Sequence, residues 1–315
     1  MKTMAPPWHQ EAWDRLRVRR ERDAMPHALL LAGPAGLGKR DFLDRLVRGL
    51  LCQQPVDGDA CGQCRTCKLL DAGTHPDRID VGLEINEKTK KLRKEIIVDQ
   101  VRNLSSRLAM ASQLGGWQVA SIDPADAMNA AAANALLKTL EEPSSASLIV
   151  LVADAPWRLT ATIRSRCQRI DFRVPPAAQA LPWLEHAGVA DAGAALEAAG
   201  GNPGLAQAWA GQGMLDERRQ VQSDLAALAQ GRGDVYTVMK RWLDDDALSQ
   251  RLWFAAQMAA MDARARATGS RELLGSRLDD ETLGHWFERA NRTREALRGP
   301  LRPDLLVLDL LTHWR

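Results

Sequence analysis

Four cysteines lie close together in the chain and could hold one metal ion. Three follow one another with two residues between each pair, and a fourth precedes them: Cys61, Cys64, Cys67 and Cys52. Zn²⁺ takes four protein ligands in structural sites, whereas a catalytic zinc keeps one position open. The residues between these cysteines form turns rather than a core, so the loop needs a clamp. The spacing therefore predicts a structural Zn²⁺ site in segment 52–67.

Other uses of these thiols stay open from the sequence. Neighbouring cysteines also serve iron–sulfur clusters and redox switches, and four buried thiols without a metal are a third interpretation. Disulfides are disfavoured, because the chain has the features of a cytoplasmic protein. His75 could replace one sulfur ligand, although four cysteines already close the shell.

A glycine-rich segment just before the cysteines could hold phosphate. Gly33, Gly38 and Lys39 fit the phosphate-loop pattern, in which backbone N–H groups surround the phosphates and the lysine reaches their oxygens. The next residue should be a serine or threonine that binds Mg²⁺, but it is Arg40, which has no acceptor atom. Binding of ATP or ADP therefore stays open, and turnover is not expected. An accidental glycine turn is the alternative interpretation.

A carboxylate that helps to hold Mg²⁺ is expected at the end of a neighbouring strand. Asp123 ends the apolar run 117–122, but the next residue, where a glutamate commonly orients the attacking water, is Pro124. Together with Arg40, this removes two parts that phosphoryl transfer needs. Gly33, Gly38, Lys39 and Asp123 are therefore predicted to form a degenerate nucleotide site.

Strands that alternate with helices must position these residues. The run 28–32 predicts a buried strand before a helix at about 40–51, and strands are expected at 78–83, 117–122, 147–152 and 168–172. Helices are expected at 97–111 and 125–142, so the sheet should be parallel. We predict three domains: an α/β domain over 1–172 with the zinc module at 52–67, a small helical lid over 173–212 and an all-helical domain over 213–315.

The composition is that of an ordinary globular protein. The chain has 315 residues, enough for two or three domains, and a formal net charge of +2 that indicates no particular partner. No run of residues is apolar enough to span a membrane, and residues 1–25 carry many charges. We expect a cytoplasmic protein without a membrane partner.

Two further segments resemble bacterial clamp-loader subunits of the AAA+ class. Residues 134–143 read N-A-L-L-K-T-L-E-E-P, and residues 163–167 read I-R-S-R-C. A zinc loop inside the first domain is also characteristic of that family. The resemblance covers about residues 8–210, and beyond them only the helical character agrees. It implies an AAA+ domain with a RecA-like parallel sheet, a helical lid and a C-terminal helical collar.

The departures from the family pattern are informative. The family's ATPase subunits, gamma and tau, keep a complete phosphate loop and an Asp-Glu acid pair, both of which this chain lacks. The sensor positions fall near Asp154 and Gly204 and carry no sensor residue. The resemblance thus implies a stator subunit without catalysis of its own in a DNA-directed DNA polymerase (nucleotidyltransferase) holoenzyme. An active gamma/tau-like ATPase is the alternative.

The resemblance also implies partners and a process. The chain would act with the gamma/tau and delta subunits to load a sliding clamp on primer–template DNA during DNA replication. No base-reading module is visible in the sequence, so contact with DNA would come through the assembled complex.

The Ser-Arg-Cys motif at Ser165, Arg166 and Cys167 precedes the last predicted strand. In the family this arginine reaches ATP that a neighbouring subunit holds, a task that suits the planar, permanently charged guanidinium. The resemblance therefore makes Arg166 an arginine finger in trans, with Ser165 fixing the turn and Cys167 packing in the core. From the residues alone, Arg166 could equally be a surface arginine beside Arg164 and Arg169.

Segment 86–95 is basic and could contact DNA phosphates. Acidic residues dilute its charge, so a solvated loop that contacts partners is the alternative interpretation. Many of the ten tryptophans lie in the helical half of the chain, where they are expected to pack between helices rather than stack on bases.

Overall fold

The fold is described from a computed structural model of the whole chain. It describes residues 5–87, 89–143, 146–270, 272–297, 299 and 301–314. The chain divides into two compact units, and each is described by itself below. One unit comprises residues 1–183 and 202–205, and the other comprises residues 184–201 and 206–315.

A parallel five-stranded sheet is the centre of the first unit. Its strands pair in the order β2-β3-β4-β1-β5, with all pairs parallel. The strands are β1 (Ala28–Ala32), β2 (Arg78–Val81), β3 (Gln118–Ile122), β4 (Ser147–Ala153) and β5 (Gln168–Asp171). Every residue of β1, β3 and β4 is buried, as expected for central strands that are covered on both faces.

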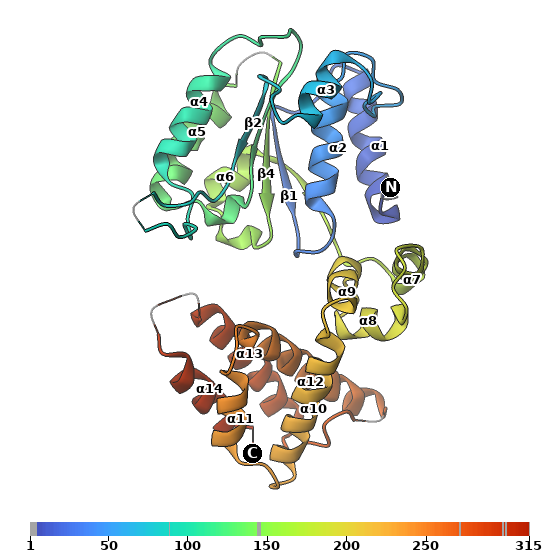
Figure 1. Cartoon of the computed structure of the whole chain (residues 1–315), viewed down its shortest axis with the longest axis vertical. Coiled ribbons are helices and arrows are strands. Elements are labelled where there is room, and N and C mark those ends of the chain that lie inside the picture. The colour runs from blue at the N-terminus through green and yellow to red at the C-terminus, as the bar shows by residue number, and fades with distance from the viewer. Residues whose placement is uncertain are drawn as a thin grey trace. The chain divides into compact units, whose positions relative to one another are not determined.

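Helices cover both faces of the sheet (Figure 1). Alternate residues of the strands belong to two separate hydrophobic clusters, since successive side chains point to opposite faces. The helices α4 (Val98–Leu108), α5 (Ala130–Glu141) and α6 (Ala161–Arg166) pack on one face. On the other face lie α1 (Gln10–Glu21) and α2 (Lys39–Leu51), while the short α3 (Arg65–Asp71) follows the cysteine loop.

The predicted helix at 125–142 is interrupted. A 3-10 turn, η2 (Ala125–Ala127), comes first, and α5 begins only at Ala130. Asn129 separates the two, because its Oδ1 accepts a hydrogen bond from the N–H of Ala132 at 2.9 Å and caps the helix. The other expected strands and helices of this unit are present, with ends shifted by a few residues.

The rest of the chain is helical, as predicted. Besides η2, the first unit has two further 3-10 turns among its described residues, η1 (Pro7–His9) and η3 (Pro156–Arg158). After β5 the helices are α7 (Ala177–His186), α8 (Ala192–Ala198), α9 (Pro203–Ala210), α10 (Met214–Ala229), α11 (Val235–Trp242), α12 (Leu248–Thr268), α13 (Asp280–Ala296) and α14 (Pro303–Thr312).

The predicted fold class, an α/β core with a cysteine cluster and a helical C-terminal region, is confirmed. The boundaries of a lid at 173–212 and a collar at 213–315 stay a prediction. Tryptophans pack inside the helical unit, where Trp242, Trp286 and Trp314 are fully buried. Within the described ranges, no helix is both long and apolar enough to cross a lipid bilayer.

Candidate metal centre and phosphate loop

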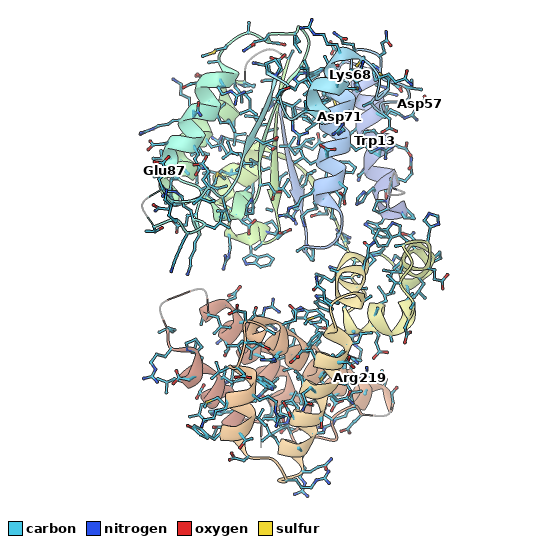
Figure 2. The ribbon with its side chains drawn as sticks, viewed as in Figure 1. Trp13, Asp57, Lys68, Asp71, Glu87 and Arg219 are labelled. Carbon is cyan, nitrogen blue, oxygen red and sulfur yellow. The ribbon has the colours of Figure 1, made fainter. Side chains whose placement is uncertain are left out.

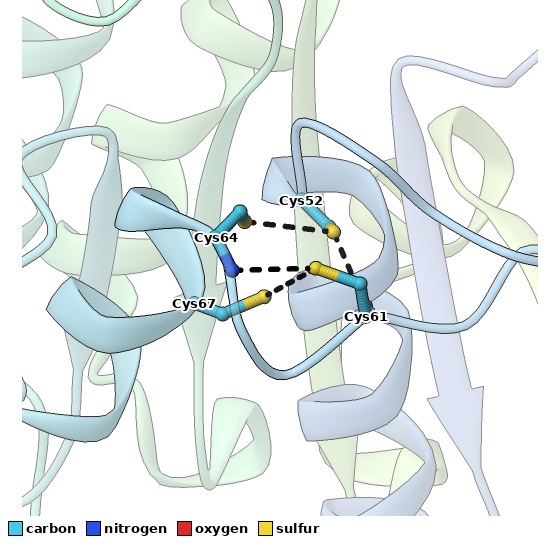
Figure 3. Close-up of side chains that lie close together, drawn as sticks. All are labelled: Cys52, Cys61, Cys64 and Cys67. Carbon is cyan, nitrogen blue, oxygen red and sulfur yellow. Dashed lines mark hydrogen bonds between the residues drawn. The ribbon is translucent and has the colours of Figure 1, made fainter.

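The four predicted cysteines converge on one point (Figure 3). Their sulfur atoms all lie within 4.8 Å of one another. Cys52 Sγ is 3.8 Å from Cys64 Sγ, and Cys61 Sγ is 4.0 Å from Cys67 Sγ. Sulfurs bound to one tetrahedral zinc at ~2.3 Å would lie ~3.8 Å apart. The cluster could therefore hold a metal ion of that size.

Hydrogen bonds around the cluster suit thiolates. The N–H groups of Gln54 and Cys61 donate to Cys52 Sγ at 3.4 and 3.3 Å. The N–H of Cys64 donates to Cys61 Sγ at 3.4 Å. Donors of this kind stabilise negative sulfur and orient metal ligands. His75, the alternative ligand, does not belong to the group.

Ion pairs fix the cysteine loop to the neighbouring helices. Arg45 of α2 lies over the ring of Trp13 at 3.7 Å and binds both oxygens of Asp59 in the loop at 2.6 and 2.7 Å. Arg48 of α2 binds Asp71 of α3 at 2.6 Å. Trp13 and Asp71 are labelled in Figure 2, close to α2. Contacts other than the cysteines thus tie Asp59 of the loop and the following helix α3 to α2.

Lys39 does not point toward an open phosphate site. Its ammonium group lies 2.6 Å from each of three oxygens: the carbonyls of Gly33 and Pro34, and Oδ1 of Asp154. Two of these contacts are hydrogen bonds and the third is an ion pair, so the ammonium group is engaged by oxygens of the chain. The side chain is only 1% exposed. Burial lowers the pKa of Lys39, and the ion pair with Asp154 opposes that effect.

Arg40 completes a cluster of four charges at the carboxyl ends of β3 and β4. Its guanidinium donates two hydrogen bonds of 2.8 Å to Asp123 and a third of 3.1 Å to Asp154. Burial pushes the pKa of Asp154 upward, but the ion pairs with Lys39 and Arg40 outweigh burial and hold that pKa below its ordinary value. The predicted Asp123 is thus engaged by arginine, in the place where a magnesium ion would need it.

Two aromatic side chains close the same loop from the N-terminal side. The carbonyl of Leu37 lies 2.8 Å from His9 Nε2 and accepts a hydrogen bond from Trp8 Nε1 at 3.1 Å. His9 is buried, with its ring edge-on to Phe42 and Phe172. His9 therefore helps to fix the phosphate loop, through its hydrogen bond to Leu37 and its packing against the two phenylalanine rings.

The segment 202–205 lies against the loop. Asn202 donates from Nδ2 to the carbonyl of Ala35 at 2.7 Å and is buried. A Cβ atom at Gly204 would lie 2.0 Å from the carbonyl oxygen of Gly36. A side chain at this position would collide with the loop, so Gly204 cannot be replaced by a sensor residue in this arrangement.

The Ser-Arg-Cys motif ends α6. Arg166 donates from Nε to Glu141 at 2.9 Å and pairs with the same carboxylate through Nη2, while Nη1 donates to the carbonyl of Thr162 at 3.0 Å. Its side chain is 34% exposed. Ser165 donates to Thr162 within the same turn. Burial raises the pKa of Cys167 to about 11, which suits a packing role.

The basic segment forms an exposed turn after β2, near the labelled Glu87 in Figure 2. The N–H of Asn86 donates to the carbonyl of Lys91 at 2.8 Å, and Ile85 pairs with Leu92. Lys90, Lys91 and Lys94 are exposed, and Lys88 lies outside the described residues.

Sequence reasoning missed the partners of the key side chains. The sequence marks Asp154 only as a position without a sensor residue and Glu141 only as part of the motif 134–143. Neither is predicted to pair with Lys39, Arg40 or Arg166. His9 and Asn202 were not connected to the loop. An aspartate directly after the strand run 147–153 is the one signal that could have found Asp154, because parallel strands bring their carboxyl ends to one edge.

Comparisons with known proteins identify the family. The model of the family described as "DNA polymerase III, delta subunit" matches residues 8–176, more than half of the chain. The DNA polymerase III subunit delta' of Escherichia coli (strain K12) is 34% identical over 270 residues, which are 85% of this chain and 78% of that protein. This chain belongs to the delta' family of DNA polymerase III subunits.

A further delta' subunit agrees with this membership. The delta' subunit of Pseudomonas aeruginosa is 45% identical over 219 residues, which are 68% of this chain and 64% of that protein. The chain therefore spans less than two thirds of the length of that relative. A solved gamma subunit-related protein of Thermotoga maritima covers 96% of this chain and 98% of its own, at 16% identity and a TM-score of 0.45. Membership of the delta' family confirms the resemblance to clamp-loader subunits.

Proposed function

We propose that this delta' family member is a non-hydrolysing stator subunit of the DNA polymerase III clamp loader. One observation carries the proposal: the ammonium group of Lys39 donates to two carbonyls of the loop and is ion-paired with Asp154, so it is engaged within the chain itself. Arg40 and Asp123 are likewise paired with each other. Phosphoryl transfer needs a free lysine and a magnesium site, and neither is available in this arrangement.

The isolated chain tests this part of the proposal. We expect no ATP hydrolysis above background and no saturable binding of Mg-ATP, measured by phosphate release and by calorimetry. Rapid turnover by the purified chain would instead support the gamma/tau-like ATPase. Bound ADP without turnover would overturn only the claim that the loop is closed to nucleotide.

We further propose that Arg166 acts in trans on ATP held by a neighbouring subunit. Its position at the exposed end of α6 supports this role, since a guanidinium there can leave the chain's own surface. Glu141 holds it in the free chain, and a triphosphate with its greater charge could replace that carboxylate. A solved assembly with the Arg166 guanidinium far from any adjoining triphosphate would contradict the role.

The proposed partners follow from the family. They are the gamma/tau and delta subunits, the sliding clamp and primer–template DNA, reached through the assembled complex. Within the DNA polymerase holoenzyme the chain would serve as a structural subunit and contribute the guanidinium of Arg166. It would catalyse no reaction of its own. Segment 86–95 stays a candidate contact for DNA phosphates or for a partner.

For the cysteine cluster we propose a structural zinc ion held by Cys52, Cys61, Cys64 and Cys67. The distances between sulfurs support a tetrahedral shell, which leaves no open position for catalysis. Elemental analysis should find one zinc per chain. A redox or DNA-sensing role would be supported if a folded Cys64→Ser variant lost affinity for DNA, and our proposal expects unchanged affinity.

A further inference from the structure

A cavity of about 200 Å³ lies beside the cysteine cluster. It is at the amino ends of the strands, whereas the phosphate loop follows the carboxyl end of β1. Leu50 and Leu51 at the end of α2 form one wall, and Leu114 and Trp117 before β3 form another. His75 also lines the cavity. Cys52, one of the proposed zinc ligands, also lines the cavity, but neither the stator role nor the role of Arg166 uses this space.

His75 presents an unused donor to the cavity. The N–H of Asp77 donates to His75 Nδ1 at 3.2 Å, so a neutral ring carries its proton on Nε2. His75 is 6% exposed, and within the described chain Nε2 has no hydrogen-bond partner. A buried donor without an acceptor costs free energy, which a ligand oxygen would recover.

The wall that faces His75 is fixed in place. The carboxylate of Asp77 accepts hydrogen bonds from the N–H groups of Gln113 and Leu114 at 2.8 and 3.0 Å. Asp77 thus holds both the histidine ring and the loop in front of it. A site whose polar group and wall share one buried anchor is organised before any ligand arrives.

We propose that this cavity binds one apolar side chain of a protein partner, with His75 Nε2 donating to a backbone carbonyl oxygen of the same segment. The volume suits a leucine-sized group and is below the ~300 Å³ at which pockets for small-molecule ligands begin. Gly115 and Gly116 on the rim are exposed, and a Cβ atom on either would touch nothing, so an extended segment can pass over them.

Short peptides test the proposal on the full chain. The probes are a capped Gly-Gly-Leu-Gly-Gly peptide, capped pentaglycine, and 4-methylpentanamide, which carries the same side chain and carbonyl as a free small molecule. Binding is followed by NMR shifts of the Trp117 indole and His75 imidazole. We expect the leucine peptide to bind with a dissociation constant on the order of 1 mM, tighter than both other probes.

Variants show whether the named residues carry the binding. His75→Phe should weaken the leucine peptide by about tenfold, because it removes the donor and keeps a ring. Leu114→Trp should fill the entrance of the cavity and abolish binding of the leucine peptide. If His75→Phe fails to fold, Leu114→Trp tests whether the peptide binds in this cavity. Thr74→Ala, an exposed neighbour, should bind as the wild type does. All variants should keep their metal content.

Several outcomes would overturn the proposal. Equal binding of leucine and glycine peptides would exclude an apolar anchor. Binding of 4-methylpentanamide alone would make the cavity a small-molecule site. No binding of any probe, or a crystal structure in which ordered water occupies Nε2 and no probe displaces it, would make His75 merely a hydrated core residue.

Discussion

At the scale of single residues, Lys39 decides what the loop can do. The sequence keeps the lysine that normally reaches phosphate, but the side chain turns inward to two carbonyls and Asp154. A buried charge must be paired, and here the chain supplies the pair itself. The phosphate loop has thus become part of the protein's internal ion pairing.

Asp154→Asn should destabilise the chain by about 2–4 kcal/mol at pH 7, since it leaves a buried ammonium without its counterion. The loss is measured by urea unfolding. Asp14→Asn is the control, because its pair with Arg17 is exposed and should contribute less than about 1 kcal/mol. Equal effects of the two substitutions would show that the Lys39 pair contributes little.

The stability difference between the wild type and Asp154→Asn should depend on pH. Because the pKa of Asp154 is lowered in the folded chain, its stabilisation is full above the unfolded pKa of about 3.9 and is lost as pH falls through the folded value. The difference in free energy of unfolding between wild type and Asp154→Asn should therefore shrink between about pH 5 and about pH 3. A constant difference over that window would contradict the pairing.

Thiol reactivity separates Cys167 from the other four cysteines. Burial raises the pKa of Cys167 to about 11, so less than about one part in a hundred is thiolate at pH 8. With metal bound, no cysteine should react quickly with a thiol reagent. After a chelator loosens segment 52–67, the four cysteines of that segment should become accessible and react, whereas Cys167 stays within the hydrophobic core of the sheet and should remain slow. A fast fifth thiol in the folded chain would contradict its buried position.

At the scale of elements, the close approach of segment 202–205 to the loop depends on glycine. A Cβ atom at Gly204 would collide with the carbonyl of Gly36. Gly204→Ala should cost at least about 2 kcal/mol or detach this segment, seen as a lower apparent Tm. Gly193→Ala in α8 meets nothing within 4 Å and should be neutral or stabilising. Equal Tm values for the two variants would contradict the packing.

Metal removal should loosen segment 52–67 and leave the sheet folded. The two hydrophobic clusters of the core lie on the faces of the sheet and do not pass through the sulfurs. Chelation should therefore keep most of the far-UV circular dichroism while the loop becomes sensitive to protease. Complete unfolding would show that the metal stabilises the whole domain.

The elements of the α/β core could largely be predicted from the sequence. Continuous apolar runs such as 28–32 and 147–153 match buried parallel strands. The break before α5 was missed because the alanine-rich run 130–133 continues the helical pattern, while the cap at Asn129 depends on one hydrogen bond. The local pattern thus predicts the elements but misses the start of α5, which the side chain of Asn129 decides.

At the scale of the whole molecule, the residues of the metal centre and the phosphate loop could be predicted from the sequence. The contacts that their side chains make with one another could not. The four cysteines, Lys39, Arg40 and Asp123 were named from residue type and spacing. The inward turn of Lys39 was not, because Asp154 lies far along the chain and meets it only through the order of strands. Contacts between distant segments depend on topology, which local pattern does not contain.

The central claim is that the chain has a closed nucleotide site of its own and lends Arg166 to a neighbour. The most direct test is steady-state ATP hydrolysis by the reconstituted clamp loader that contains an Arg166→Ala chain. Arg164→Ala, an exposed arginine on the same helix, is the matched control. We expect Arg166→Ala to lower turnover at the neighbouring site by about 10³-fold and Arg164→Ala to leave it near the wild-type value. Wild-type turnover at every site of the Arg166→Ala complex would contradict the claim.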